Sequence, residues 1–239
     1  MNRAGCAVGN HLDTVKLRSN LDPVKIQRQN LPMSEHKESL SKSRYHHGDL
    51  RQSLLNTATA IIREGGVDAL SIRKLADQVG VSRTAPYHHF KDKRALLCAI
   101  AEQGFAQQAA AVNALTETAG ADGRVLFEAY VIAYIRFADE NPETYELMFG
   151  KEIWKQGNPT ESLKAISKAS FQHWLEWVGR LQQQGLLPAD HATLRVAQAS
   201  WATLHGLCRL FNDGVYTDRE NLEAMGKTAA ALLLNTPQT

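Results

Sequence analysis

The stretch Ser71–Phe90, SIRKLADQVGVSRTAPYHHF, predicts two short helices joined by a tight glycine turn. Ser71 is a favourable N-cap because its hydroxyl can accept a backbone N–H bond. Gly80 stands where a left-handed backbone is needed to end the first helix. This order of elements is typical of a helix-turn-helix. The apolar residues of the first helix recur at helical spacing, at Ile72, Leu75, Ala76 and Val79.

The second predicted helix begins at Ser82 and carries hydrogen-bond donors in place of aliphatic residues. Such donors bind the phosphates and base edges of duplex DNA. A small connecting helix with a solvated face is the alternative interpretation. Pro86 deletes one N–H and disfavours helical geometry at Ala85, so we expect the start of this helix to be displaced by a residue or two. The donors are Arg83, Thr84, Tyr87, His88 and His89.

The positive charge of the chain is local. The formal net charge of the 239 residues is only +2, whereas residues 42–94 hold ten Lys and Arg against five Asp and Glu. Within this segment a predicted helix, Asp49–Glu64, ends at Gly65-Gly66 and supports the helix-turn-helix. A longer helix begins at Asp92 and runs toward Ala119. Residues 1–43 are polar, lack sustained apolar periodicity and are expected to form a disordered arm.

Several short motifs together resemble the TetR (tetracycline repressor) family over roughly Arg44–Phe105. They are Gly-Gly at 65–66, SIRKLA at 71–76, GVS at 80–82, YHHF at 87–90 and KDK at 91–93. A second, shorter match is WATLHG at 201–206, which is similar to the Trp-His-Gly signature of one class of ligand domains in that family. The resemblance implies an all-α fold and a homodimer, with no cofactor. It places a DNA-binding domain at residues 44–105 and a ligand-binding and dimerisation domain at 106–239.

Nine residues are expected to contact a double-stranded DNA operator. Arg83 and Thr84 lie at the start of the second helix, where side chains reach base edges. Phosphate contacts are expected from Ser82, Tyr87, His88 and Lys91, and the set is completed by Arg44, Ser71 and Arg73. A basic arm around Arg44 would touch DNA from outside the helix-turn-helix.

From Asp122 onward the pattern is helical, without strand-like alternation. Apolar residues on more than one side of the last two helices indicate a bundle that also buries a subunit interface. The predicted helices are 125–140, 143–150, 162–184, 189–212 and 219–234.

Aromatic residues and histidines gather on these helices and suit either a packed core or a cavity. Core and cavity are equally supported for Trp174 and Trp201, whereas core is favoured for His173 and His205, since buried histidines are usually structural. The family resemblance favours a cavity for a small, largely apolar effector, with His205 as its polar anchor. Replacing Gly206 with leucine is expected to fill it. The predicted ligand-binding residues are Tyr130, Phe137, Met148, His173, Trp174, Trp201 and His205.

Other classes of protein find little support in the sequence. Three dispersed cysteines, Cys6, Cys98 and Cys208, form no C-x-x-C pair, and no Glu-x-x-His or HExxH motif occurs, which argues against a metal site or an enzyme. No membrane span or secretion signal is predicted, so a cytoplasmic location is expected. The family resemblance implies a repressor that releases a pseudo-palindromic operator when a small molecule binds. The rival interpretation is a helical ligand-binding or scaffold protein whose basic helices bind an acidic protein.

Overall fold

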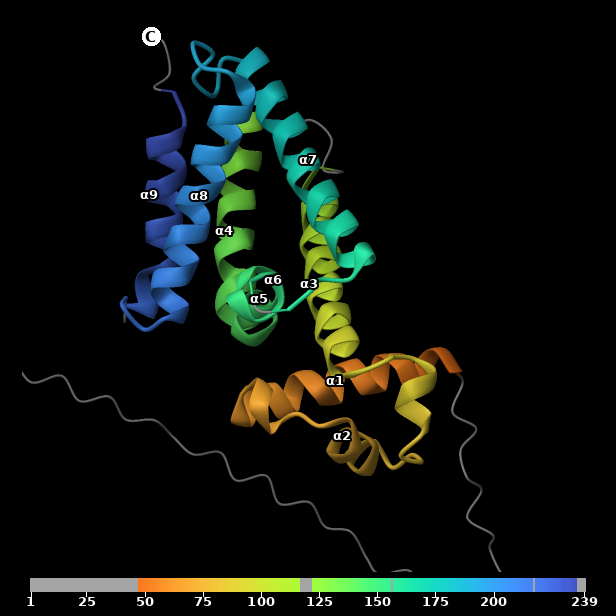
Figure 1. Cartoon of the computed structure of the whole chain (residues 1–239). Coiled ribbons are helices and arrows are strands. Elements are labelled where there is room, and N and C mark those ends of the chain that lie inside the picture. The colour runs from red at the N-terminus through yellow and green to blue at the C-terminus, as the bar shows by residue number, and fades with distance from the viewer. Residues whose placement is uncertain (1–46, 117–121, 156, 217, 236–239) are drawn as a thin grey trace, which may run out of the picture. The chain divides into compact units, whose positions relative to one another are not determined.

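The chain is described by a computed structural model that covers residues 47–116, 122–155, 157–216 and 218–235 (Figure 1). In these ranges every regular element is a helix, so the all-α prediction is confirmed. The predicted arm at residues 1–43 and Arg44 lie outside the described residues. The α-helices are α1 His47–Gly65, α2 Ile72–Val79, α3 Lys93–Thr116, α4 Gly123–Glu140, α5 Pro142–Phe149, α6 Lys151–Trp154, α7 Glu161–Gln183, α8 Thr193–Asn212 and α9 Leu222–Leu233. Short 3₁₀ helices occur at η1 Val67–Ala69, η2 Ala85–His88 and η3 Arg219–Asn221.

The first half of the helix-turn-helix forms as the sequence predicts. The Ser71 hydroxyl accepts the Lys74 N–H at 3.1 Å, which caps α2. Gly80 adopts the left-handed conformation, with φ 76° and ψ 31°. The Val81 N–H then turns back to the Ala76 carbonyl at 3.0 Å and closes the end of α2. Ala76 is fully buried, as expected for a helix crossing so close to a tight turn.

A second short helix is present, but the prediction that it begins at Ser82 is wrong, because it starts at Ala85. This segment is a turn followed by the four-residue 3₁₀ helix η2. In an α-helix the N–H at position 86 would donate to the Ser82 carbonyl, but Pro86 has no N–H. The Ala85 N–H bonds that carbonyl instead, at 3.0 Å, and the Tyr87 N–H bonds the Thr84 carbonyl at 3.1 Å. Both bonds span three residues, so the proline fixes the tighter 3₁₀ geometry.

Helix α3 starts immediately after this segment. The Asp92 carboxylate caps it by accepting the Ala95 N–H at 2.7 Å. The Lys93 ammonium donates to the Val67 carbonyl at 2.7 Å, which ties α3 back to η1. Apolar residues of α1, α2 and the first half of α3 form one core, which continues into α5, α6 and α7 through Leu147, Met148, Ile153 and Leu163.

A second core lies between α4, α7, α8 and α9 (Figure 1). Helix α4 ends at Asn141-Pro142, as predicted, and α5 follows directly. Helix α8 begins at Thr193, four residues later than predicted, because residues 189–192 form a loop. The Gln182 side chain holds this loop by donating to the carbonyls of Pro188 and His191, at 2.6 and 3.1 Å. None of the helices in the described ranges is long and apolar enough to cross a bilayer.

Two glycine substitutions should have opposite effects on stability. Gly80→Ala forces a side chain into the left-handed conformation that ends α2, which should lower the free energy of unfolding by about 1 kcal/mol. Gly179 lies inside α7, where an added Cβ would make an ordinary contact, 3.5 Å from Thr193. Gly179→Ala should therefore raise the free energy of unfolding by about 0.5–1 kcal/mol. Urea denaturation measures both, and a stabilising Gly80→Ala would contradict the turn geometry.

Candidate nucleic-acid interface and ligand cavity

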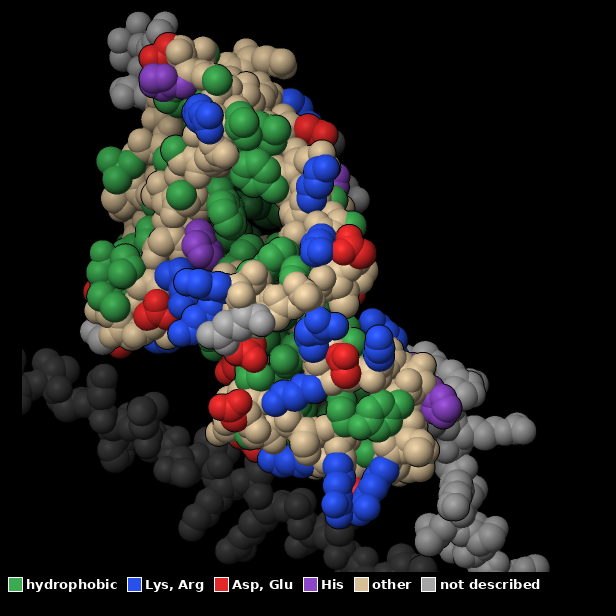
Figure 2. Space-filling view, viewed as in Figure 1, with side chains coloured by type: hydrophobic (Ala, Val, Ile, Leu, Met, Phe, Trp, Pro, Cys, Tyr) green, Lys and Arg blue, Asp and Glu red, His purple; other side chains and the backbone are tan. Residues whose placement is uncertain are grey.

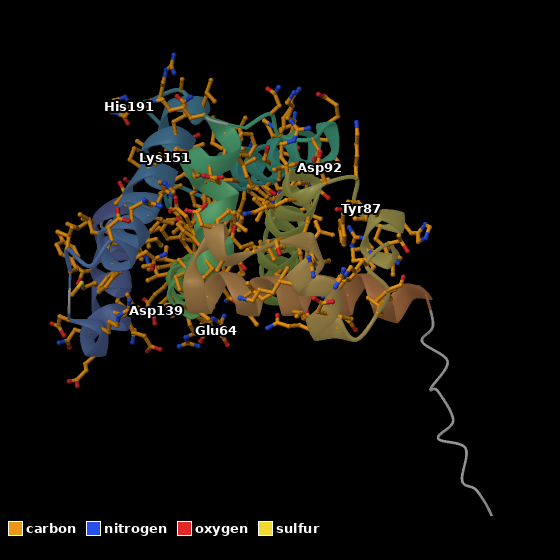
Figure 3. The ribbon with its side chains drawn as sticks, turned by 60° about the horizontal axis from the view of Figure 1, so that its bottom comes forward. Glu64, Tyr87, Asp92, Asp139, Lys151 and His191 are labelled. Carbon is orange, nitrogen blue, oxygen red and sulfur yellow. The ribbon has the colours of Figure 1, made fainter. Side chains whose placement is uncertain are left out.

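The segment from α2 to the start of α3 presents polar side chains to solvent. Tyr87, labelled in Figure 3, lies on η2 and is 56% exposed although it is aromatic. Pro86 on the same turn is buried and anchors the segment against the core. Every described member of the predicted DNA-contacting set is exposed, namely Ser71, Arg73, Ser82, Arg83, Thr84, Tyr87, His88 and Lys91.

The basic side chains in this segment and on the adjoining α1 differ in their contact partners. The Arg83 guanidinium lies 3.9 Å from the Asp77 carboxylate of α2, and both side chains are more than half exposed. Exposed ion pairs of this kind contribute little to stability, so Arg83 can exchange this partner at small cost. Arg51 lies over the Phe90 ring, 5.4 Å from its centroid. Lys93, in contrast, is occupied by its bond to the Val67 carbonyl.

Helix α3 and the C-terminal helices line a cavity of about 360 Å³ that is partly open to solvent. Figure 2 shows a hollow with hydrophobic side chains inside it in this part of the chain. Four of the predicted ligand residues lie in the cavity wall, namely Tyr130, Met148, Trp174 and Trp201. The remainder of the wall is Phe105, Gln108, Tyr134, Phe149, Trp154, Ser167, Ser170 and Phe171.

The structure does not place the other three predicted ligand residues in this wall. Phe137 packs between the two cores. His173 is exposed and borders a second cavity of about 180 Å³, which shares Gln108, Tyr130, Ser170 and Trp174 with the first. His205 is not in the wall, but its ring stacks on that of Trp201, with 5.2 Å between the two centroids.

Gly206 also lies away from the cavity. An added Cβ would meet no heavy atom within 4 Å, and the residue is absent from both cavity walls. The expectation that Gly206→Leu fills the cavity is therefore wrong. Positions 201 and 206 are five residues apart on α8, so their side chains differ in direction by more than a quarter turn around the helix axis.

A chain of hydrogen bonds runs through one side of the cavity wall. The Trp201 indole N–H donates to the Tyr134 hydroxyl at 3.1 Å, which lies 3.1 Å from the Tyr145 hydroxyl. The Tyr145 hydroxyl lies 2.6 Å from Nδ1 of His205. One consistent direction has Tyr134 donating to Tyr145 and Tyr145 donating to His205, which makes His205 an acceptor inside the protein.

Burial keeps the members of this chain uncharged. Burial lowers the pKa of His205, and the nearby Arg209 guanidinium lowers it further, so the imidazole accepts as a neutral group. Burial raises the pKa of Tyr134 and Tyr145 well above that of a free phenol. It also raises the pKa of the adjacent Cys208 thiol to about 12, so this thiol is not a nucleophile at neutral pH.

Sequence reasoning missed most of the α7 and α3 contributions to the cavity. A usable signal was present on α7, where Ser167, Ser170, Phe171 and Trp174 follow the i, i+3, i+4, i+7 spacing of one helix face. Phe105 and Gln108 share a face of α3 in the same way. Trp154 lies on the four-residue helix α6, which no periodicity could have predicted.

Two protein families match separate parts of the chain. Residues 54–100 match the family described as "Bacterial regulatory proteins, tetR family", and residues 127–233 match "Tetracyclin repressor-like, C-terminal domain". The first match contains the helix-turn-helix, and the second contains most of the cavity wall.

Curated relatives match shorter parts of the chain. Tetracycline repressor protein class C from Escherichia coli is 44% identical over 52 residues, which are 22% of this chain and 24% of the relative. The HTH-type transcriptional repressor AcnR from Corynebacterium efficiens is 33% identical over 107 residues, 44% of this chain and 50% of the relative. The chain thus spans a quarter to a half of the length of these relatives.

Solved structures match over more of the chain. A protein of unknown function from Rhodococcus sp. RHA1 is 33% identical, with a TM-score of 0.67 over 81% of this chain and 100% of that one. The TetR family transcriptional regulator PfmR from Thermus thermophilus is 24% identical, with a TM-score of 0.59 over 78% and 99% of the two chains. The second likeness shows a shared fold.

Proposed function

Because the chain belongs to the TetR family of bacterial regulatory proteins, we propose that it is a ligand-responsive transcriptional repressor. Residues 44–105 bind operator DNA, and residues 106–239 bind a small molecule and a second subunit. Filling the cavity favours a state with lower affinity for the operator. A cytoplasmic location and the absence of catalysis fit this role.

The observation that carries this proposal is the course of α3. The helix begins at Lys93, directly after the exposed segment proposed to contact DNA, and places Phe105 and Gln108 in the cavity wall. One rigid element therefore belongs to both sites, so a change in the cavity can alter the position of the DNA-contacting segment. A ligand shifts this equilibrium only by its difference in affinity for the two states.

The DNA-contacting residues divide into two roles. Arg83 and Thr84 lie at the start of the exposed segment and read base edges. Lys91 and the remaining exposed donors hold phosphates, which positions the segment without selecting a sequence. The position of Arg83 and Thr84 supports this division, since both are exposed and directly precede η2.

A gel shift with duplexes from the DNA flanking the gene tests DNA binding and the two roles. Lys91→Ala should weaken binding to all duplexes alike and reduce the log–log salt slope by ~0.9 for each phosphate that is no longer neutralised, hence ~1.8 for a dimer. Thr84→Ala should mainly alter the preference among operator variants. If neither protein nor variant binds DNA, or if both variants lose affinity and selectivity equally, the assignment is wrong.

We further propose that α8 and α9 form the dimer interface. Apolar side chains remain exposed on both helices, with Leu194 42% and Leu232 82% accessible to solvent. A dimer formed through α8 and α9 would remove these apolar side chains from water. A dimer holds two DNA-binding units at half-sites about one helical turn, ~34–36 Å, apart.

A charge on this face should separate the subunits. Leu232→Glu should convert the dimer to a monomer in sedimentation and, because one half-site alone binds weakly, reduce operator affinity in parallel. Val125→Glu is the matched control, because Val125 is 60% exposed but lies on the first turn of α4. A Leu232→Glu monomer with full operator affinity would show that DNA binding does not need the dimer.

A further inference from the structure

The cavity wall contains an unpartnered polar group. Nε2 of Gln108 is buried and has no hydrogen-bond partner among the described residues. The side chain comes from α3, and Gln108 belongs to the walls of both cavities. A buried donor without a partner is unfavourable and rare in folded proteins.

The other N–H donors of the wall are already occupied by protein atoms. The two serine hydroxyls of the wall likewise donate to carbonyls of their own helix, at 3.0 Å each. Two side-chain donors of the wall are therefore left for a polar ligand atom, Nε2 of Gln108 and the Tyr130 hydroxyl, and only Nε2 of Gln108 is a buried atom without a partner. The occupied indole bonds are Trp154 to the Met148 carbonyl, Trp174 to the Ala197 carbonyl and Trp201 to the Tyr134 hydroxyl.

The rest of the larger cavity is aromatic and uncharged. Eight of its twelve lining residues are aromatic, and none is Asp, Glu, Lys, Arg or His. An anion in the larger cavity would find no cation there, because Arg180, together with Glu176 and His173, borders only the second cavity. Burying an unpaired charge is strongly unfavourable. A cation could lie against the aromatic faces, but it would find no carboxylate and would leave the Gln108 donor unpaired.

We propose that the effector is an uncharged, largely aromatic molecule with an oxygen acceptor, and that Gln108 binds this acceptor. This inference rests on the proposed function in that it names the ligand class of the same cavity. The aromatic body lies among Tyr130, Trp174 and Trp201, and the acceptor faces the Gln108 amide. Gln108 is then the specificity-determining residue of the site.

Four bicyclic probes of similar size separate the possibilities when each is titrated calorimetrically into the full-length protein. Coumarin is neutral and has a carbonyl acceptor, naphthalene is neutral without one, 1-methylquinolinium is a cation and 2-naphthoate an anion. Coumarin should bind most tightly. Gln108→Leu should weaken coumarin about tenfold, the effect of one ordinary hydrogen bond, and leave naphthalene binding unchanged.

Two further variants make the test independent of misfolding. Gln107→Leu changes the exposed neighbour on α3 and should alter neither affinity. Gln108→Glu keeps the shape of the side chain but replaces the donor with a carboxylate. It should reverse the preference, so that 1-methylquinolinium binds more tightly than coumarin.

Several results would overturn the inference. They are tighter binding of either charged probe than of coumarin by the unaltered protein, unchanged coumarin binding in Gln108→Leu, or no binding of any probe up to its solubility limit. Measuring operator release with the same probes distinguishes these results from a failure of the proposed function. A charged probe that binds and releases operator refutes the ligand class alone, whereas coumarin that binds through Gln108 and leaves operator affinity unchanged refutes the regulatory role alone.

Discussion

The packing of α3 into both halves of the described chain is the constraint on which the rest of the structure depends. Its first turns bury Leu96, Leu97 and Ile100 in the core that also contains residues of α1 and α2, so the helix cannot move without the segment proposed to contact DNA. Farther along, it contacts α5 and α7 and supplies part of the cavity wall. Gly104 lets α5 approach closely, since an added Cβ there would overlap the Met148 side chain and lie 2.7 Å from Thr144.

Local chemistry made the N-terminal helices predictable. Ser71 and Gly80 act through backbone conformation within a few residues, and Asp92 caps the next helix in the same way, so the sequence alone was sufficient. Pro86 carried the signal that the second helix was short. The proline does more than shift the start of the helix. The N–H that it lacks is the one that would donate to the Ser82 carbonyl, and an α-helix beginning at Ser82 needs this bond.

The cavity was predictable only in part, because side chains on four or more helices must be placed relative to one another before a wall exists. Large aromatic residues such as Trp174 and Trp201 identified the region. His205 was predicted in the cavity wall but is not part of it. The sequence pattern of a histidine on an apolar helix face is the same whether its ring contacts a ligand or, as here, a buried tyrosine hydroxyl. Gln108 shares a helix face with Phe105, but the sequence does not mark its amide as unpaired, since an unsatisfied amide is visible only once its surroundings are known.

The central claim is that the DNA-contacting segment and the cavity are coupled through α3, and the tryptophans allow a direct test. All four tryptophans, Trp154, Trp174, Trp177 and Trp201, lie in the C-terminal helices, and three of them line the larger cavity. Acrylamide quenching of their fluorescence can be measured while the protein is titrated with operator duplex, with a scrambled duplex of equal length as control. Coupling predicts that the quenching constant changes with operator and saturates with DNA binding. A quenching constant that stays the same with operator fully bound would contradict the account.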